Sequence, residues 1–201
     1  MPHLILASTA RYRYELLERL RLPFSAHAPH VDETPLPGEE PRSAAQRLAR
    51  AKAQAVAAQH PGALVIGSDQ TATLDGQGIL GKPGNHATAR AQLRAASGRS
   101  VRFHTALALV RRADGFAEEE VVDTHVRFRS LTEEEIEAYL EAEQPYDCTG
   151  SAKCEGLGIA LLEAIDGPDP TALVGLPLIA LTGALRRAGL PPLPGPESRR
   201  G

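Results

Sequence analysis

Two charged side chains stand in apolar surroundings and are the first candidates for chemistry. Asp69 follows the apolar run 63–66, and α/β proteins place catalytic groups at the carboxyl ends of such buried strands. Lys52 interrupts the apolar face of a helix expected over 43–60, and lysines are almost never buried without a partner. Asp69 is therefore a catalytic carboxylate or a turn residue. Lys52 either faces an internal cleft or extends its ammonium group to solvent.

The N-terminal strand-to-helix junction offers a place for an anion. Residues 3–7 predict a short buried strand, and a helix is expected over 11–22, with Ser8 or Thr9 as its N-cap. The free N–H groups and the positive dipole of a helix start attract phosphate. Arg13 in the first turn opposes that dipole, and a bound anion would resolve the conflict. An ordinary cap beside a solvated arginine explains the same residues.

Further charged residues lie in loops and identify no site by themselves. Lys82 occupies 81–84, where glycine and proline restrict the backbone. This loop is not a P-loop, because it lacks the preceding glycine spacing and the following Ser or Thr. Glu33 precedes the Pro-rich loop 35–38, and the polar segment 151–156 is explained equally well by a solvated loop or a binding site.

Strands and helices are mixed along the chain, which predicts an α/β fold with a mixed sheet and flanking helices. A hairpin turn is expected at Asp75–Gly76, and Thr132 with Glu135 forms a capping box. The remaining strands are expected at 24–28, 63–66, 101–110, 119–129 and 159–162, and the remaining helices at 43–60, 87–96, 132–139 and 176–187.

Length and charge limit the classes of function. The 201 residues suit one large domain or two lobes around a cleft, and 42% are hydrophobic. A net charge of −3 argues against a nucleic-acid polymer as partner, so an anionic ligand must be bound by a few placed cations.

The chain carries no pattern of a targeting segment or of a histidine-bound metal. The apolar run 4–7 is too short for a signal peptide or a membrane span, which favours a cytoplasmic protein without a membrane partner. Cys148 and Cys154 fit reduced thiols in that compartment. The seven histidines form no metal-binding motif, and the polar tail 191–201 is expected to be disordered.

The order of several short motifs is far more specific than any one of them. They are LILAST, Arg13 with LLERL, VDETP, ARAKAQAVA, IGSDQ, LDG, LGKP, SLTEEEIEAYL, GSAKCEGLGI and VGLPLIAL. In this order they resemble the Maf family of nucleoside triphosphate pyrophosphatases, and within it the branch assigned to 7-methyl-GTP. The resemblance extends to about Leu190.

The resemblance implies an ITPase-like α/β fold with two lobes around a central cleft, formed by a single domain over 1–190. It also implies a homodimer that hydrolyses a nucleotide with Mg or Mn. The roles that it implies are Asp69 as general base, Glu33 and Asp69 at the metal, Ser8, Arg13, Lys52 and Lys82 on the triphosphate, and Tyr12, Gln70 and Glu155 in base choice.

One departure from the family and two alternatives remain. The family usually has Ser-x-Ser-Pro at the first junction, where this chain has Ser8-Thr9-Ala10-Arg11, and Tyr14 stands where a second basic residue is frequent. Arg11 is a candidate replacement for the lost charge. The alternatives are a dTTP/UTP pyrophosphatase of the sister branch and a non-enzymatic nucleotide-binding regulator of cell division. The presence of both Asp69 and Lys82 favours an enzyme over the regulator, because a regulator could have lost either residue.

Overall fold

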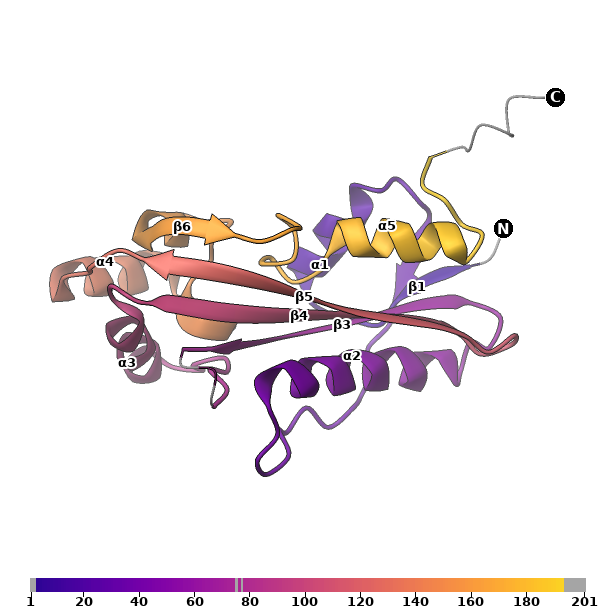
Figure 1. Cartoon of the computed structure of the whole chain (residues 1–201), viewed down its shortest axis with the longest axis horizontal. Coiled ribbons are helices and arrows are strands. Elements are labelled where there is room, and N and C mark those ends of the chain that lie inside the picture. The colour runs from indigo at the N-terminus through magenta and orange to yellow at the C-terminus, as the bar shows by residue number, and fades with distance from the viewer. Residues whose placement is uncertain (1–2, 75, 77, 194–201) are drawn as a thin grey trace.

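A six-stranded mixed sheet forms the centre of the protein, as a computed structural model shows for residues 3–74, 76 and 78–193 (Figure 1). The strand order is β2-β1-β3-β4-β5-β6, and the α/β prediction is confirmed. The strands are β1 (Leu4–Leu6), β2 (Phe24–Ala26), β3 (Leu64–Thr73), β4 (Ser100–Arg111), β5 (Phe116–Phe128) and β6 (Leu162–Asp166). The helices are α1 (Arg11–Glu18), α2 (Pro41–Ala57), α3 (His86–Ala96), α4 (Glu133–Glu143) and α5 (Leu178–Arg187), with 3-10 turns η1 (Thr149–Ser151) and η2 (Leu157–Leu161).

The lengths of β1 and β3 create an open sheet edge. β1 pairs in parallel with β3 only from Leu64 to Ile66, whereas β3 continues antiparallel to β4 as far as Thr73. The prediction that the strand ends at Ile66 is therefore wrong, because β4 supplies hydrogen-bonding partners for the whole of 65–73. Asp69 lies inside a long strand, at the point where the neighbouring strand β1 has ended.

The helices cover the sheet in two groups. At one end of the long strands, α1 and α5 lie on one face and α2 lies on the other (Figure 1). At the other end, α3 and α4 pack around a separate apolar cluster that includes Phe103, Phe128 and Tyr139. These two halves share β3, β4 and β5, and they are the two lobes expected from the sequence.

Small residues let α2 approach the sheet closely. A Cβ atom added at Gly67 would stand 2.1 Å from the Ala49 carbonyl oxygen and 2.9 Å from the Ala53 Cβ atom. The alanines of α2 therefore pack directly on β3, and this contact sets the height of Lys52 above the strand. Within the described residues, no helix combines the length and the apolar character that a membrane crossing requires.

Two predictions about the ends of α1 are wrong. α1 begins after Ala10, and the Ser8 hydroxyl accepts a hydrogen bond from the Ala10 amide rather than capping the helix as the predicted N-cap would. α1 ends at Glu18 rather than residue 22, because Arg21 adopts a left-handed backbone (φ 54°) and Pro23 disfavours a helical residue before it.

The segment 159–162 was expected to be a strand, but η2 occupies most of it and β6 begins at Leu162. Gly158 packs on the Lys153 backbone, where an added Cβ would be 2.5 Å from the carbonyl oxygen, and this tight contact curls the segment. The Thr132–Glu135 capping box is confirmed. Asp75 of the expected hairpin turn and residues 194–201 of the expected tail lie outside the described residues.

Candidate active site

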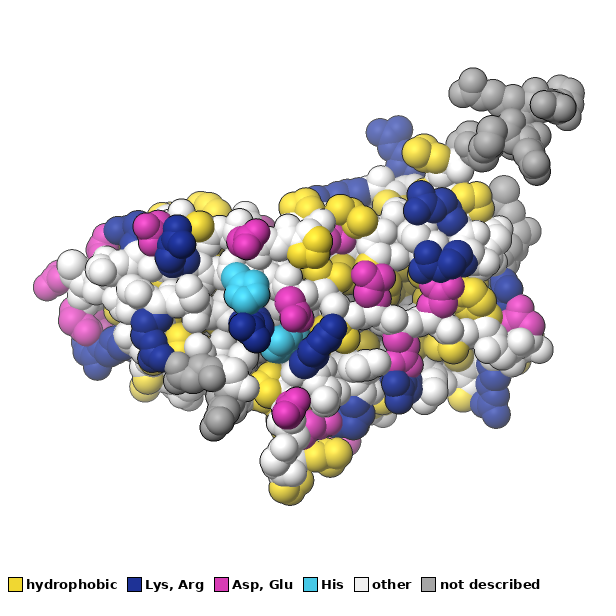
Figure 2. Space-filling view, viewed as in Figure 1, with side chains coloured by type: hydrophobic (Ala, Val, Ile, Leu, Met, Phe, Trp, Pro, Cys, Tyr) yellow, Lys and Arg dark blue, Asp and Glu magenta, His cyan; other side chains and the backbone are white. Residues whose placement is uncertain are grey.

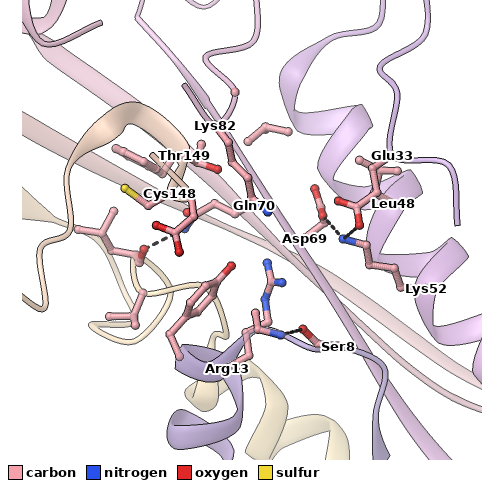
Figure 3. A pocket seen from close by; sticks show the side chains of 18 of the residues that line it. Ser8, Arg13, Glu33, Leu48, Lys52, Asp69, Gln70, Lys82, Cys148 and Thr149 are labelled. Atoms are coloured by element: carbon pink, nitrogen blue, oxygen red, sulfur yellow. Dashed lines mark hydrogen bonds and ion pairs between the residues drawn. The ribbon is translucent and has the colours of Figure 1, made fainter. Parts of the chain in front are cut away.

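A cavity of about 560 Å³ lies along the open edge of β3, between the two halves of the molecule (Figure 3). Its wall is formed by the β1–α1 junction, α1, α2, β3, Phe103 of β4 and the loops around 29–35, 79–82, 147–155 and 173–174. All nine candidate residues contribute to the wall: Ser8, Tyr12, Arg13, Glu33, Lys52, Asp69, Gln70, Lys82 and Glu155.

Lys52 projects from α2 into the cavity and binds two carboxylates. Its Nζ atom lies 2.7 Å from Asp69 Oδ1 and 3.0 Å from Glu33 Oε1 (Figure 3). Lys52 is only 4% exposed, so the interpretation in which its ammonium extends to solvent is wrong. The two partners differ, since Asp69 is buried and the Glu33 side chain is about half exposed at the cavity mouth.

Asp69 is a buried carboxylate with opposing influences on its pKa. Burial raises the pKa above its usual range, because removal from water disfavours the charged form. The positive charges of Lys52 and Arg13 oppose this effect, and Lys52 also donates a hydrogen bond. A carboxylate whose pKa is raised by burial is a stronger base than an ordinary aspartate, which suits it to accept a proton.

Arg13 is buried, so the interpretation of it as a solvated arginine is wrong. It is 7% exposed, and its Nε atom donates a hydrogen bond to the Gly175 carbonyl oxygen at 2.9 Å. Its guanidinium carbon lies 5.2 Å from the centre of the Tyr12 ring. Buried Ser8 stands beside it at the end of β1 (Figure 3). The junction thus directs one cation and one hydroxyl group toward the cavity.

Lys82 enters the cavity from the opposite side and is exposed. Within the described part of the chain it has neither a hydrogen bond nor an ion pair, unlike Lys153, whose Nζ atom lies 3.2 Å from Asp147. On the face shown in Figure 2, positive and negative side chains are interspersed. Arg13 and Lys52 are distinguished from such surface cations by their burial.

Gln70 and Ser68 point to the other face of β3, away from α2. The Gln70 Nε2 atom donates to the Thr105 hydroxyl at 2.9 Å and approaches the carbonyl oxygens of Ala172 and Leu173 at 3.1 and 3.0 Å. The Ser68 hydroxyl lies 2.8 Å from the Ala106 carbonyl oxygen and 2.9 Å from that of Gly175. This face therefore uses neutral hydrogen bonds, in contrast to the ion pairs around Asp69.

Tyr12 and Glu155 line the cavity from different loops. Tyr12 is half-buried and packs against Gly175, where an added Cβ atom would be 2.8 Å from the ring. Glu155 is exposed, and its carboxylate accepts a weak hydrogen bond from the Cys154 thiol at 3.6 Å. An aromatic ring and a carboxylate are thus available to one ligand.

The donor set near Lys52 suits a hard divalent cation. Glu33 and Asp69 each place one oxygen within 3.0 Å of the Lys52 ammonium nitrogen, so two carboxylates lie together at this side of the cavity. Mg²⁺ is usually held by one or two carboxylates together with substrate phosphates. Among the described residues there is no group of three or more His, Cys, Asp or Glu side chains that could hold a metal. The two carboxylates match the number that Mg²⁺ usually takes from a protein when substrate phosphates supply the other oxygens.

Other residues of the site escaped the sequence analysis. They are Ser68, Thr105 and the backbone of 172–175, which hold Gln70 and Arg13. A polar Thr105 within the apolar pattern of 101–110 is a signal that would have found one of them. The roles predicted for the nine residues stay predictions.

Comparison with known proteins identifies close relatives. A family described as Maf-like protein matches residues 3–188. A Burkholderia pseudomallei protein named 7-methyl-GTP pyrophosphatase is 64% identical over 193 residues, which cover 94% of this chain and 89% of the relative. A Cupriavidus metallidurans protein of the same name is 60% identical, with 94% of this chain and 95% of the relative covered.

Solved structures give a more distant likeness. A HAM1 protein from Coxiella burnetii aligns with a TM-score of 0.49 at 16% identity, covering 93% of this chain and 100% of that chain. A nucleoside-triphosphatase, dITP/XTP pyrophosphatase, from Mycobacterium abscessus aligns with a TM-score of 0.44 at 19% identity, covering 71% of this chain and 95% of that chain.

Proposed function

This chain belongs to the Maf-like protein family, and on that basis we propose that it is a 7-methyl-GTP pyrophosphatase. It would hydrolyse the α–β phosphoanhydride to give 7-methyl-GMP and pyrophosphate. Relatives with that name, 60–64% identical over nearly the whole chain, support the substrate. The observation that carries the reaction is the buried Lys52–Asp69 pair facing the cavity.

In the proposed mechanism, Asp69 orients the attacking water and accepts its proton. The water oxygen bonds to the α-phosphorus, the bond to the bridging oxygen breaks, and pyrophosphate leaves with that oxygen. Only ionised Asp69 accepts a proton, and Lys52 and Arg13 favour the ionised form. General-base assistance of this kind contributes about 100- to 10,000-fold in rate.

The phosphates would be bound by cations from three elements. Arg13 of α1, Lys52 of α2 and Lys82 of the loop before α3 line the same cavity, and Ser8 adds a hydroxyl donor. These groups would neutralise the triphosphate and stabilise the charge that develops on the departing pyrophosphate. Because Arg13 and Lys52 are already fixed by hydrogen bonds, little reorganisation is needed when substrate binds.

A divalent cation fits the same region. Glu33 and Asp69 would hold Mg²⁺ or Mn²⁺ together with phosphate oxygens. When bound, the cation supplies further neutralisation of phosphate charge. Lys52, which touches both carboxylates, would keep them oriented toward the cavity.

The base would be recognised by Tyr12, Gln70 and Glu155. 7-Methylguanine carries a positive charge on its ring, and a cation over an aromatic face gains about 0.5–2 kcal/mol. The exposed Glu155 carboxylate would accept charge-assisted hydrogen bonds from the N–H edge of the same base. Uncharged pyrimidines would lose the ring-charge contribution and would offer Glu155 one N–H group instead of two.

A substrate panel tests this proposal. Purified protein is incubated with 7-methyl-GTP, GTP, dTTP and UTP plus Mg²⁺ or Mn²⁺, in ¹⁸O-labelled water, and pyrophosphate and monophosphate are quantified. We expect 7-methyl-GMP to carry the label, because water attacks the α-phosphorus. Preference for dTTP or UTP would establish the sister-branch activity, and binding without turnover would favour a nucleotide-binding regulator.

A further inference from the structure

Four consecutive residues, Ala172–Gly175, cross the cavity side of β3 and are called the strap here. The Gly175 carbonyl oxygen accepts a hydrogen bond from Arg13 Nε at 2.9 Å and lies 2.9 Å from the Ser68 hydroxyl. The Ala172 carbonyl oxygen accepts from the Thr105 hydroxyl at 2.8 Å. The strap is therefore the shared acceptor for side chains of α1, β3 and β4.

The strap also decides which end of the Gln70 amide faces a ligand. The Thr105 hydroxyl donates its single proton to the Ala172 carbonyl oxygen, so towards Gln70 the Thr105 oxygen can only accept a hydrogen bond. The carbonyl oxygens of Ala172 and Leu173 can likewise only accept. The Gln70 nitrogen must therefore face the strap, which leaves its oxygen as an acceptor for a donor group of the base.

The side chains of buried Asp169 and half-buried Thr171 hold the strap against α5. Asp169 is 3% exposed, and its Oδ1 atom accepts from the amide and the hydroxyl of Thr171 at 2.9 and 2.6 Å. Its Oδ2 atom accepts from the Ile179 amide at 2.7 Å. The Thr171 hydroxyl in turn accepts from the Leu178 amide at 2.8 Å. These contacts fix both ends of the segment 169–179.

We propose that Asp169 and Thr171 are positioning residues, which fix the strap and through it the phosphate-binding Arg13 and the base-reading Gln70. This inference rests on the proposed function, since it assigns those roles to Arg13 and Gln70. Neither Asp169 nor Thr171 lines the cavity, so both act through the strap carbonyl oxygens.

The proposal predicts a particular division of kinetic effects. Asp69 is held from the other face of β3 by Lys52, with no contact to the strap. Displacing the strap should therefore weaken nucleotide binding and base discrimination more than it slows the chemical step, to which Arg13 also contributes. A rise in KM that is larger than the fall in kcat is the signature of a loss mainly of binding that ground state and transition state share.

A matched pair of variants at Thr171 supplies the test. Thr171→Val keeps the shape but removes the hydroxyl, whereas Thr171→Ser keeps both hydroxyl contacts. We expect Thr171→Val to raise KM for 7-methyl-GTP by about 10-fold, as for a weakened hydrogen bond to a charged group, with a smaller fall in kcat. The preference for 7-methyl-GTP over GTP should fall, and Thr171→Ser should behave as wild type. The proposal would be overturned if Thr171→Val and Thr171→Ser had equal effects on KM. It would also be overturned if Thr171→Val lowered kcat and left the preference for 7-methyl-GTP over GTP unchanged.

A second pair covers the case in which Thr171→Val fails to fold. Thr105→Val removes the hydroxyl that joins Gln70 to the strap, and Thr105→Ser keeps it. Thr105→Val should reduce the preference for 7-methyl-GTP over GTP, and Thr105→Ser should not. An unchanged preference in folded Thr105→Val refutes the proposal.

If the wild-type protein hydrolyses no nucleotide, the proposed function fails by itself. The strap is then tested by calorimetry with inorganic tripolyphosphate, whose affinity should fall about 10-fold in Thr171→Val but not in Thr171→Ser. Equal affinities would refute the strap's role.

Discussion

The residues on the two faces of β3 are held by different interactions, ion pairs on one face and neutral hydrogen bonds on the other. Toward α2, Asp69 is held by the Lys52 ammonium group, which also binds Glu33. Toward the strap, Ser68 and Gln70 are held by hydroxyl groups and backbone carbonyl oxygens. Because side chains alternate across a strand, neighbours in sequence serve the two environments.

The difference separates two tasks within one short segment. Charged groups in a buried setting change the proton affinity of Asp69 and would bind phosphate. Neutral hydrogen bonds fix the direction of the Gln70 amide without adding charge near the base. On this account, substitutions on the α2 face should alter rate and pH dependence, and substitutions on the strap face should alter substrate choice.

The largest effect is expected for Asp69→Asn, which removes the proton acceptor and keeps the side-chain shape. The value of kcat should fall by at least about 100-fold for every nucleotide, the low end for a lost general base. The preference between nucleotides should stay the same. The exposed Asp166→Asn is the control, and wild-type turnover by Asp69→Asn would remove Asp69 from this role.

Lys52→Met is expected to lower kcat/KM by about 10- to 100-fold, because a charged phosphate contact is lost. It also removes a charge that lowers the pKa of Asp69, so that pKa should rise further. Since the ionised form is needed, the acidic limb of the rate profile should move to higher pH. A protonated Asp69 no longer carries a buried charge, so the variant should gain stability as pH falls through the raised pKa. An unmoved pH profile, compared with Lys52→Arg, would contradict the coupling.

Gly67→Ala tests the contact between α2 and β3. The new methyl group would meet the Ala49 carbonyl oxygen at 2.1 Å, so the helix must move outward and carry Lys52 away from Asp69. Overpacking of this kind costs about 1–3 kcal/mol of unfolding free energy, which denaturant titration measures. Gly62→Ala, with no atom within 4 Å, is the control. Equal stability of the two variants would show that the α2 contact is not tight.

Smaller effects are expected for Tyr12→Arg and Glu155→Ala. Tyr12→Arg should narrow the preference for 7-methyl-GTP over GTP by a factor that corresponds to about 0.5–2 kcal/mol, the range for a cation over an aromatic ring, and Glu155→Ala should narrow the preference in the same direction. Turnover of GTP should change less. An equal fall in kcat/KM for 7-methyl-GTP and for GTP, measured side by side, would instead indicate that these residues support the loop structure.

The α2 face was largely predictable from the sequence, because its signals are local. Lys52 within an apolar helical stripe offered a buried charge as one of two interpretations, and Asp69 after an apolar run was either a catalytic carboxylate at the sheet or a turn residue. The end of β3 was not predictable, because its continuation depends on pairing with β4, whose partner residues lie about 30 to 40 residues further along the chain.

The strap face gave little sequence signal. Contacts of Ser68 and Gln70 with residues 172–175 span about a hundred residues, and most acceptors are backbone carbonyl groups that no residue type reveals. Asp169 stands in a Pro-rich stretch that resembles an ordinary turn. The single domain over 1–190, the homodimer and the cytoplasmic location stay predictions.

Internal competition between 7-methyl-GTP and GTP tests the central claim most directly. Both nucleotides are present at equal concentration in one reaction, and the ratio of the two monophosphates formed early gives the ratio of kcat/KM values. The account predicts an excess of 7-methyl-GMP, because only the methylated base carries a ring charge that Tyr12 and Glu155 favour. Equal amounts of the two monophosphates would contradict it.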